Sequence, residues 1–271
     1  KNRVNAGLHV IDSEILDMVS IDADKIGTVD ETTGKTVKVD LDRQLLKPLA
    51  GSGKMFCYDS PEYVKDMGTP ARFHQVEEDY KAGRVSAKNL SNKQKAMFLD
   101  RDGTINKYVG FLRNIDDFEL IDGVSEAIKK INASGYLAIV VTNQPVIARG
   151  EVTFQELEEI HNKMETLLGK EGAYLDAIYY CPHHPHKGYE GECPELKIEC
   201  DCRKPKPGML LKAAEDFNID LSQSWMIGDG ENDVKAGINA GCRTVLLSNS
   251  DESYGQTKTM KSLNEFTKTM L

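Results

Sequence analysis

The chain has 271 residues, enough for one or two domains with a hydrophobic core. Its 43 acidic and 34 basic residues give a net charge of −9, which argues against nucleic acid or an anionic membrane as a partner. No apolar run approaches the length of about 18 residues needed to span a bilayer. Six cysteines, four of them between positions 181 and 202, indicate metal binding in a reducing cytoplasm and not disulfides.

The first predicted domain covers residues 1–88. Because the chain starts at Lys1 with a strand pattern, we expect a fragment or a processed product of a longer protein. The expected elements are a strand over 8–11, a helix over 14–20, a helix over 40–50, a strand over 55–58 and a helix over 71–83.

Two strings of this domain resemble the closing part of a sugar-1-phosphate nucleotidyltransferase. They are Asn5-Ala6-Gly7 and Asp66-Met67-Gly68-Thr69-Pro70. The resemblance implies that Asn5 contacts a sugar and that Asp66 helps to hold a metal. The Gly-rich nucleotide-binding loop of that family does not occur in the sequence. We therefore expect a small α/β remnant that packs on the second domain or supports self-association, and no nucleotidyl transfer.

A polar linker is predicted at 89–95, and a second domain at 96–271. Strand and helix patterns alternate through this second domain. Strands are predicted over 97–100, 137–142, 175–180, 224–228 and 243–247, and helices over 123–133, 153–169, 207–217, 231–240 and, weakly, 262–271. This alternation predicts an α/β fold with a doubly wound parallel sheet, which binds ligands at the carboxyl ends of its strands.

Two carboxylates, Asp100 and Asp102, close the first apolar strand of this domain. Side chains two residues apart on an extended backbone point to the same side, so a hard cation such as Mg²⁺ can sit between them. The pair also suits a nucleophile with a neighbouring proton donor. A surface turn with a helix cap is the alternative.

Polar groups end the next strands as well. Thr142, Asn143 and Gln144 offer a hydroxyl and two amides for phosphate oxygens. Arg203 and Lys204 precede a helix and could clamp a phosphate, although a solvated basic loop would look the same.

The strand over 224–228 is followed by Asp229 and Asp233. We expect Asp229 to reach the cation held by Asp100, and Asp233 to secure the loop or Lys204. Either acid alone could be a helix cap. Together, the four strand ends resemble the four-motif signature of the haloacid dehalogenase-like hydrolases.

This resemblance implies a phosphatase mechanism. Asp100 would attack phosphorus and form an aspartyl-phosphate, and Asp102 would protonate the leaving oxygen and then activate water. Thr142 and Lys204 would hold the transferring phosphoryl group. Mg²⁺ would be bound by Asp100, Asp229 and the backbone carbonyl of Asp102, with Asp233 in support.

A second metal site is predicted from Cys181, His183, Cys200 and Cys202. Two close pairs of nitrogen and sulfur ligands bridged by a loop are typical of structural zinc. Such a site would fold the loop and pin Arg203 and Lys204. The alternative ligands are His184, His186 and Cys193.

The spacing of the motifs leaves no room for a large cap domain, because core elements use most of the chain between Asp100, Thr142 and Lys204. The zinc loop and the segment 107–113 must then shape the pocket. We expect Tyr108, Gly110 and Phe111 to contact a small sugar or amino-alcohol phosphate.

Within the family, residues 98–247 resemble the phosphatases of heptose bisphosphate and of histidinol phosphate, which share the string Cys181-Pro182-His183-His184-Pro185 and the string Cys200-Asp201-Cys202-Arg203-Lys204-Pro205. The adjoining nucleotidyltransferase remnant favours removal of the 7-phosphate of D-glycero-D-manno-heptose 1,7-bisphosphate, since the two activities would be consecutive. Histidinol-phosphate hydrolysis is the first alternative, and a zinc-stapled interaction module without turnover is the second.

Overall fold

The computed structural model describes residues 10–12, 14, 26–29, 32, 34, 36, 38, 40–56 and 60–271. The chain contains two compact units, one within residues 5–60 and one that includes residues 61–271. No helix in the described part of the chain has the length and apolar character needed to cross a membrane.

The first unit contains a π-helical turn, η3 (Leu41–Leu46), that continues into α1 (Lys47–Leu49). The Asp40 side chain caps it by accepting from the Arg43 amide, and Leu45 and Leu49 are its buried residues. The helix predicted over 40–50 is therefore confirmed. The strand predicted over 55–58 is wrong at Met55 and Phe56, which are exposed and not in a strand.

Other predictions for the first 20 residues fall mostly outside the described residues, including the contact assigned to Asn5. The described residues 10–12 are not in a strand. An extended segment forms a stable strand only when its backbone pairs with a neighbouring strand, and residues 10–12 belong to no such pair.

The second unit opens with α2 (Pro70–Lys81) and α3 (Arg84–Ala87). The helix predicted over 71–83 is confirmed as α2, which begins one residue earlier: Thr69 caps it by accepting from the Arg72 amide, and Pro70 occupies its first turn. Asp66, a predicted metal ligand, instead pairs with Arg72 and accepts from the Gly68 amide at 2.7 Å. It belongs to no cluster of metal-binding side chains among the described residues.

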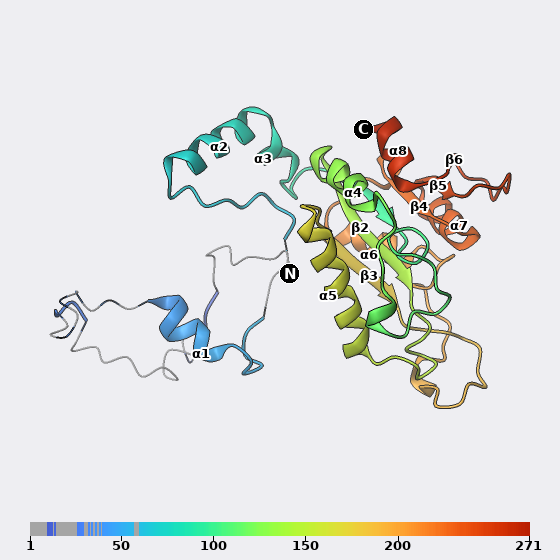
Figure 1. Cartoon of the computed structure of the whole chain (residues 1–271), viewed down its shortest axis with the longest axis horizontal. Helices are drawn as coiled ribbons and strands as arrows, with labels where there is room; N and C mark the ends of the chain where they lie inside the picture. Colours follow the sequence, from blue (N-terminus) through green and yellow to red (C-terminus); the bar gives the residue numbers. More distant parts are fainter. Residues whose placement is uncertain are drawn as a thin grey trace. The chain divides into compact units, whose positions relative to one another are not determined.

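A six-stranded sheet forms the centre of this unit (Figure 1). Its strands are β1 (Lys95–Leu99), β2 (Tyr136–Asn143), β3 (Ala177–Cys181), β4 (Trp225–Gly228), β5 (Arg243–Leu247) and β6 (Lys258–Met260). All neighbours are parallel, and their order is β3-β2-β1-β4-β5-β6. The sequence missed only β6, a short edge strand without a buried residue.

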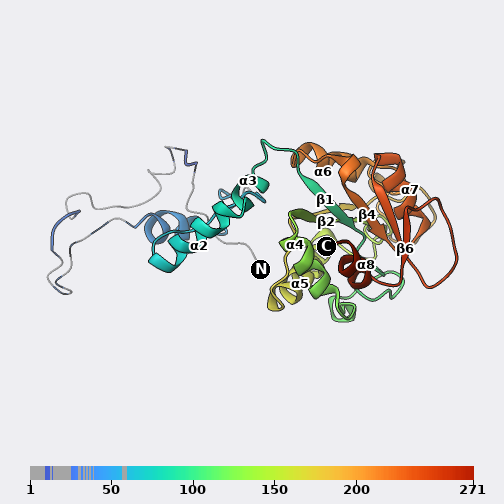
Figure 2. The same ribbon diagram turned by 90° about the horizontal axis from the view of Figure 1, so that it is seen from above.

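Helices cover both faces of the sheet, as Figure 2 shows. The helices are α4 (Val124–Ala133), α5 (Phe154–Lys170), α6 (Gly208–Asp216), α7 (Glu231–Ala240) and α8 (Leu263–Met270). One apolar core joins the sheet to α4, α5 and α8, and a second core joins it to α6 and α7. The doubly wound α/β prediction is confirmed, and the helix bounds agree within one or two residues.

The parallel register brings the polar strand ends to one edge of the sheet. Leu99, the last residue of β1, pairs with Val140 on one side and with Ile227 on the other. The Asp100 amide donates to the Ile227 carbonyl at 2.9 Å, so the chain after β1 stays beside β4. Asp100, Thr142 and Asp229 are therefore neighbours although more than 120 positions separate the first from the last.

No cap domain interrupts residues 100–271, all of which the structure describes. Between β1 and β2 the chain forms the short 3-10 helix η4 (Ile115–Asp117) and α4. Beyond β3 it forms a loop with η5 (Pro194–Leu196) before α6, and η6 (Leu221–Gln223) precedes β4. The site at the sheet edge is bounded by loops.

The packing of α8 yields a stability prediction. Phe266 is fully buried, and its ring meets that of Trp225 edge-on at 5.2 Å. Phe266→Ala should lower the free energy of unfolding by about 3–5 kcal/mol because it leaves a cavity in the core. Chemical denaturation checks this. The matched control Lys268→Ala, on the exposed face of the same helix, should change stability by less than about 0.5 kcal/mol, and an equal loss in both variants would contradict the assigned packing.

Candidate active site

Lys204 holds the centre of the site. Its buried ammonium donates to Asp100 Oδ1 at 2.7 Å, to Asp233 Oδ1 at 2.6 Å and to the carbonyl of Val141 at 2.8 Å. All three of its protons are thus engaged. Burial alone would lower the pKa of Lys204, but Asp100 and Asp233 outweigh it and raise that pKa, so the group stays charged. The sequence left open whether Asp233 secures the loop or Lys204, and it contacts both, since its Oδ2 also accepts from the Gly230 amide at 3.1 Å.

Three carboxylates, those of Asp100, Asp229 and Asp233, gather within 4.8 Å of one another. Desolvation, together with the charge of Asp233, raises the pKa of Asp100 to about 6. Desolvation and the charge of Asp100 raise the pKa of Asp229 to about 6. Lys204 offsets only part of this negative charge. An all-oxygen, electron-rich cluster of this kind suits a hard divalent cation.

Gly103 allows the approach of Asp229. Its φ of +81° is a left-handed conformation, and a Cβ built on it would lie 2.0 Å from Asp229 Oδ2. The turn after β1 therefore passes directly against the acid that follows β4. This close contact fixes Asp229 on the side of Asp100.

Asp102 lies outside the acidic cluster and is held by a different set of partners. Arg101 donates to both of its oxygens, at 2.9 and 2.8 Å. Asn106 donates to Oδ1 at 3.0 Å and Gln144 to Oδ2 at 2.9 Å. The sequence did not predict that Arg101 and Asn106 bind the Asp102 carboxylate. Its one indication was the position of Arg101 between two aspartates.

The amides after β2 serve the frame of the site. Gln144 donates to the hydroxyl of Thr142 at 2.9 Å. Asn143 exchanges two hydrogen bonds with the backbone of Lys204, both 3.0 Å long. Asn143 thereby ties the loop before α6 to the end of β2.

A pocket of about 270 Å³ opens over these groups. Its lining includes every residue that the sequence assigns to catalysis or substrate binding, namely Asp100, Asp102, Tyr108, Gly110, Phe111, Thr142, Asn143, Gln144, Arg203 and Lys204. Asp229 and Asp233 line it as well. Pro145, which follows Gln144 in the sequence, also lines the pocket, together with Val146 and Asn232, to which the sequence did not point.

The predicted Cys/His ligands also come together. Sulfur atoms of Cys181, Cys200 and Cys202 lie 3.2–3.5 Å apart, and Nδ1 of His183 lies 3.3 Å from the sulfur of Cys202. These four side chains could hold a metal ion. The alternatives are not in the cluster: His184 faces the carbonyl of His186, and Cys193 is a separate free cysteine.

The loop that carries this cluster docks against the active-site wall. Gly150, at φ +71°, approaches the carbonyl of Gly191 so closely that a Cβ would lie 1.9 Å from its oxygen. The Arg149 guanidinium stacks between the rings of Phe111 and Tyr189, at 4.0 and 4.4 Å. Arg149 therefore joins the 107–113 segment to the loop that carries the Cys/His cluster.

The fold and these strand ends define a class of enzyme, and comparison with known proteins agrees. The family model described as HAD-hydrolase-like matches residues 201–264. Taken with the relatives given next, this shows that the chain belongs to the haloacid dehalogenase-like hydrolases, and that it is a phosphatase.

The particular relatives are phosphatases of one kind. A D-glycero-beta-D-manno-heptose-1,7-bisphosphate 7-phosphatase of Haemophilus ducreyi is 46% identical over 155 residues, which cover 57% of this chain and 82% of that protein. The protein of the same name from Escherichia coli K12 is 45% identical over 152 residues, 56% of this chain and 78% of that protein. A solved D,D-heptose 1,7-bisphosphate phosphatase from B. bronchiseptica, complexed with magnesium and phosphate, is 29% identical with a TM-score of 0.57, covering 65% of this chain and 98% of that one.

The contact between Gly103 and Asp229 yields a prediction. Gly103→Ala should displace Asp229 and lower phosphatase activity on the order of 100-fold, since misplacement by about 1 Å can cost that much. Steady-state phosphate release measures it. Gly135→Ala is the matched control, with a φ of +78° and nothing within 4 Å of the added Cβ. It should cost about 1–2 kcal/mol of stability and leave activity intact. Activity of Gly103→Ala equal to that of the control would show that the contact does not fix Asp229.

Proposed function

We propose that the chain is a Mg²⁺-dependent phosphatase that removes the 7-phosphate of D-glycero-D-manno-heptose 1,7-bisphosphate through an aspartyl-phosphate. The observation that carries the proposal is the juxtaposition of Asp100 with the Lys204 ammonium and with Asp229 at one pocket. A carboxylate can approach an anionic phosphate only where cations offset the repulsion.

In this mechanism a bond forms from an Asp100 oxygen to phosphorus as the bond to the leaving oxygen breaks. Asp102 delivers a proton to that oxygen and then takes one from the water that hydrolyses the aspartyl-phosphate. The Thr142 hydroxyl accepts from Gln144, which leaves its own proton for a phosphoryl oxygen. The Lys204 proton that bonds Asp100 would be shared with an oxygen of the transferring phosphoryl group.

Magnesium fits the cluster because all its donors are oxygens and its net charge is negative. We assign Asp100, Asp229 and the backbone carbonyl of Asp102 as the groups that hold it, with Asp233 in support through Lys204. When bound, the ion supplies charge neutralisation for the transferring phosphoryl group.

The substrate assignment draws on the relatives, whose names specify the 7-phosphate of a heptose bisphosphate at 45–46% identity. A pocket of about 270 Å³, bounded by loops and lined in part by Tyr108, Phe111 and Arg203, leaves space for a sugar. Histidinol phosphate would have to be recognised through the same loops. An interaction module without turnover would not need a buried Lys204 aligned on two acids. The nucleotidyltransferase remnant at 1–88, the self-association through it and the cytoplasmic location stay predictions.

We assign zinc to the Cys181, His183, Cys200 and Cys202 cluster. Thiolate and imidazole ligands suit zinc, and tetrahedral bonds of about 2.3 Å place sulfur atoms roughly 3.8 Å apart, close to the separations found here. Cys202 directly precedes Arg203, whose guanidinium donates to the His183 carbonyl at 3.2 Å. The ion would therefore anchor the loop that carries Arg203 and Lys204.

The nucleophile prediction is tested with Asp100→Asn. The variant should release no phosphate from heptose 1,7-bisphosphate in the presence of Mg²⁺, because an amide cannot form the aspartyl-phosphate. The parent should prefer this substrate to histidinol phosphate in kcat/KM. Asp116→Asn, an acid outside the pocket, is the charge-matched control and should keep full activity. An active Asp100→Asn variant would refute the nucleophile, and a preference for histidinol phosphate would refute the substrate.

The metal assignment of the loop is tested with Cys202→Ser. The purified parent should contain close to one zinc per chain by elemental analysis, and the variant far less, with a lower melting temperature, because metal binding contributes to folding this loop. Cys242→Ser, which alters a cysteine outside the cluster, should keep the zinc. Zinc retained by Cys202→Ser, or absent from the parent, contradicts the assignment.

A further inference from the structure

Arg101 is a fully buried cation that the proposed mechanism does not use. Its guanidinium contacts three side chains: both oxygens of Asp102, the amide oxygen of Gln144 at 3.0 Å and Nε2 of His161 at 3.4 Å. Burial of an arginine is costly unless its charge is paired and its donors are satisfied. The bonds to Asp102, Gln144 and His161 therefore indicate that Arg101 fixes the positions of these side chains.

The donor chemistry of arginine fixes the direction of the neighbouring hydrogen bonds. A guanidinium can only donate, so the Gln144 oxygen must face Arg101. The Gln144 nitrogen then faces Asp102 Oδ2 and the Thr142 hydroxyl, each at 2.9 Å. Arg101 thus orients Asp102 directly and the Thr142 hydroxyl through Gln144.

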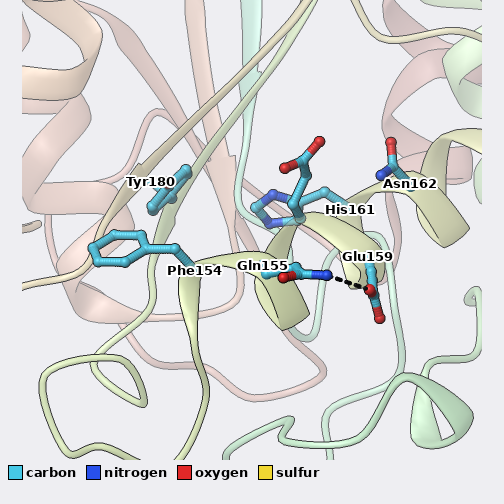
Figure 3. A pocket seen from close by; sticks show the side chains of 7 residues that line it. Phe154, Gln155, Glu159, His161, Asn162 and Tyr180 are labelled. Atoms are coloured by element: carbon cyan, nitrogen blue, oxygen red, sulfur yellow. Dashed lines mark hydrogen bonds between the residues drawn. The ribbon is translucent and has the colours of Figure 1, made fainter. Parts of the chain in front are cut away.

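His161 supports Arg101 from the other side. It lies on α5, is only 7% exposed, and lines a recess of about 690 Å³ that shares no lining residue with the active-site pocket (Figure 3). The ring of Tyr180 lies 5.7 Å away between centroids, and the charge of Asp102 also acts on His161. The recess is further lined by Phe154, Gln155, Glu158, Glu159 and Asn162.

The protonation of His161 agrees with that contact. Burial and the Arg101 charge lower the pKa of His161 to about 3, so the ring is neutral at physiological pH. Its Nε2 is then free to accept from Arg101 Nη1.

We propose that Arg101, held from behind by His161, is the positioning residue that aims Asp102 at the leaving oxygen of the substrate. The inference rests on the proposed function, in which Asp102 passes its proton to that oxygen as the bond to phosphorus breaks. A long arginine side chain has many rotamers when nothing holds it. Without the His161 acceptor, the Arg101 guanidinium would be free to move, and the Asp102 carboxylate bonded to it would move as well.

The test uses a pair of substrates with different leaving groups. An alkyl phosphate such as the sugar substrate needs a proton on its leaving oxygen, whereas p-nitrophenyl phosphate releases a stable phenolate and needs none. The value of kcat/KM reports the steps up to this bond cleavage and not the later hydrolysis of the aspartyl-phosphate. The ratio of the two kcat/KM values therefore isolates the contribution of Asp102 as an acid.

His161→Leu should lower kcat/KM for the sugar phosphate about tenfold. This is less than the roughly 100- to 10,000-fold that general acid catalysis contributes as a whole, because Asp102 is displaced and not removed. The same variant should lower kcat/KM for p-nitrophenyl phosphate less than about twofold. His161→Gln keeps an acceptor for Arg101 and should restore most of the loss. Gln155→Leu is the matched control and should leave the ratio unchanged: Gln155 lines the same recess, and among the described residues its side chain bonds Glu159 and not Arg101. Arg101→Lys, which keeps the buried charge but lacks the fork, should show the same selective loss if His161→Leu does not fold.

Equal losses on both substrates, or a Gln variant as impaired as the Leu variant, would overturn the inference and leave His161 a packing residue. A parent that hydrolyses neither substrate would instead refute the proposed function. The two failures are therefore distinguishable in one set of measurements.

Discussion

The site depends on one buried ion pair network, in which the ammonium of Lys204 bridges Asp100 and Asp233 and also bonds the carbonyl of Val141. Asp100 follows β1, Val141 lies in β2 and Asp233 lies in α7. The network therefore ties together elements that are far apart in the sequence. Like charges at this distance repel strongly at low dielectric constant. The carboxylates can therefore share the pocket only while the cation stays between them.

The position of Lys204 depends in turn on its loop, which is fixed from two directions. Asn143 holds its backbone to the end of β2, and the Cys/His cluster lies immediately before it in the chain. Arg149 adds a third restraint, since it stacks between Phe111 and Tyr189 and joins the two loops that wall the pocket. A phosphatase without a cap domain has only such loops to shape its substrate site.

The two aspartates that follow β1 stand in different environments although one residue separates them. Asp100 lies beside Lys204 and the other acids, where burial raises its pKa. Asp102 instead accepts from Arg101, Asn106 and Gln144. Two carboxylates with different roles require different surroundings, and here the ammonium of Lys204 is the group that favours the ionised form of Asp100 against burial and the neighbouring acids.

Much of this protein follows from its sequence alone. The alternation of apolar strands and amphipathic helices determined the α/β class and the element bounds, and parallel pairing required Asp100, Thr142 and Asp229 to meet at one sheet edge. Local spacing also predicted the Cys/His cluster. Tertiary structure alone decided the partners of Asp102, since a buried arginine is recognised by its surroundings and not by its neighbours in the chain. It likewise decided the short edge strand β6, which has no apolar pattern because pairing with β5, and not burial, makes it a strand.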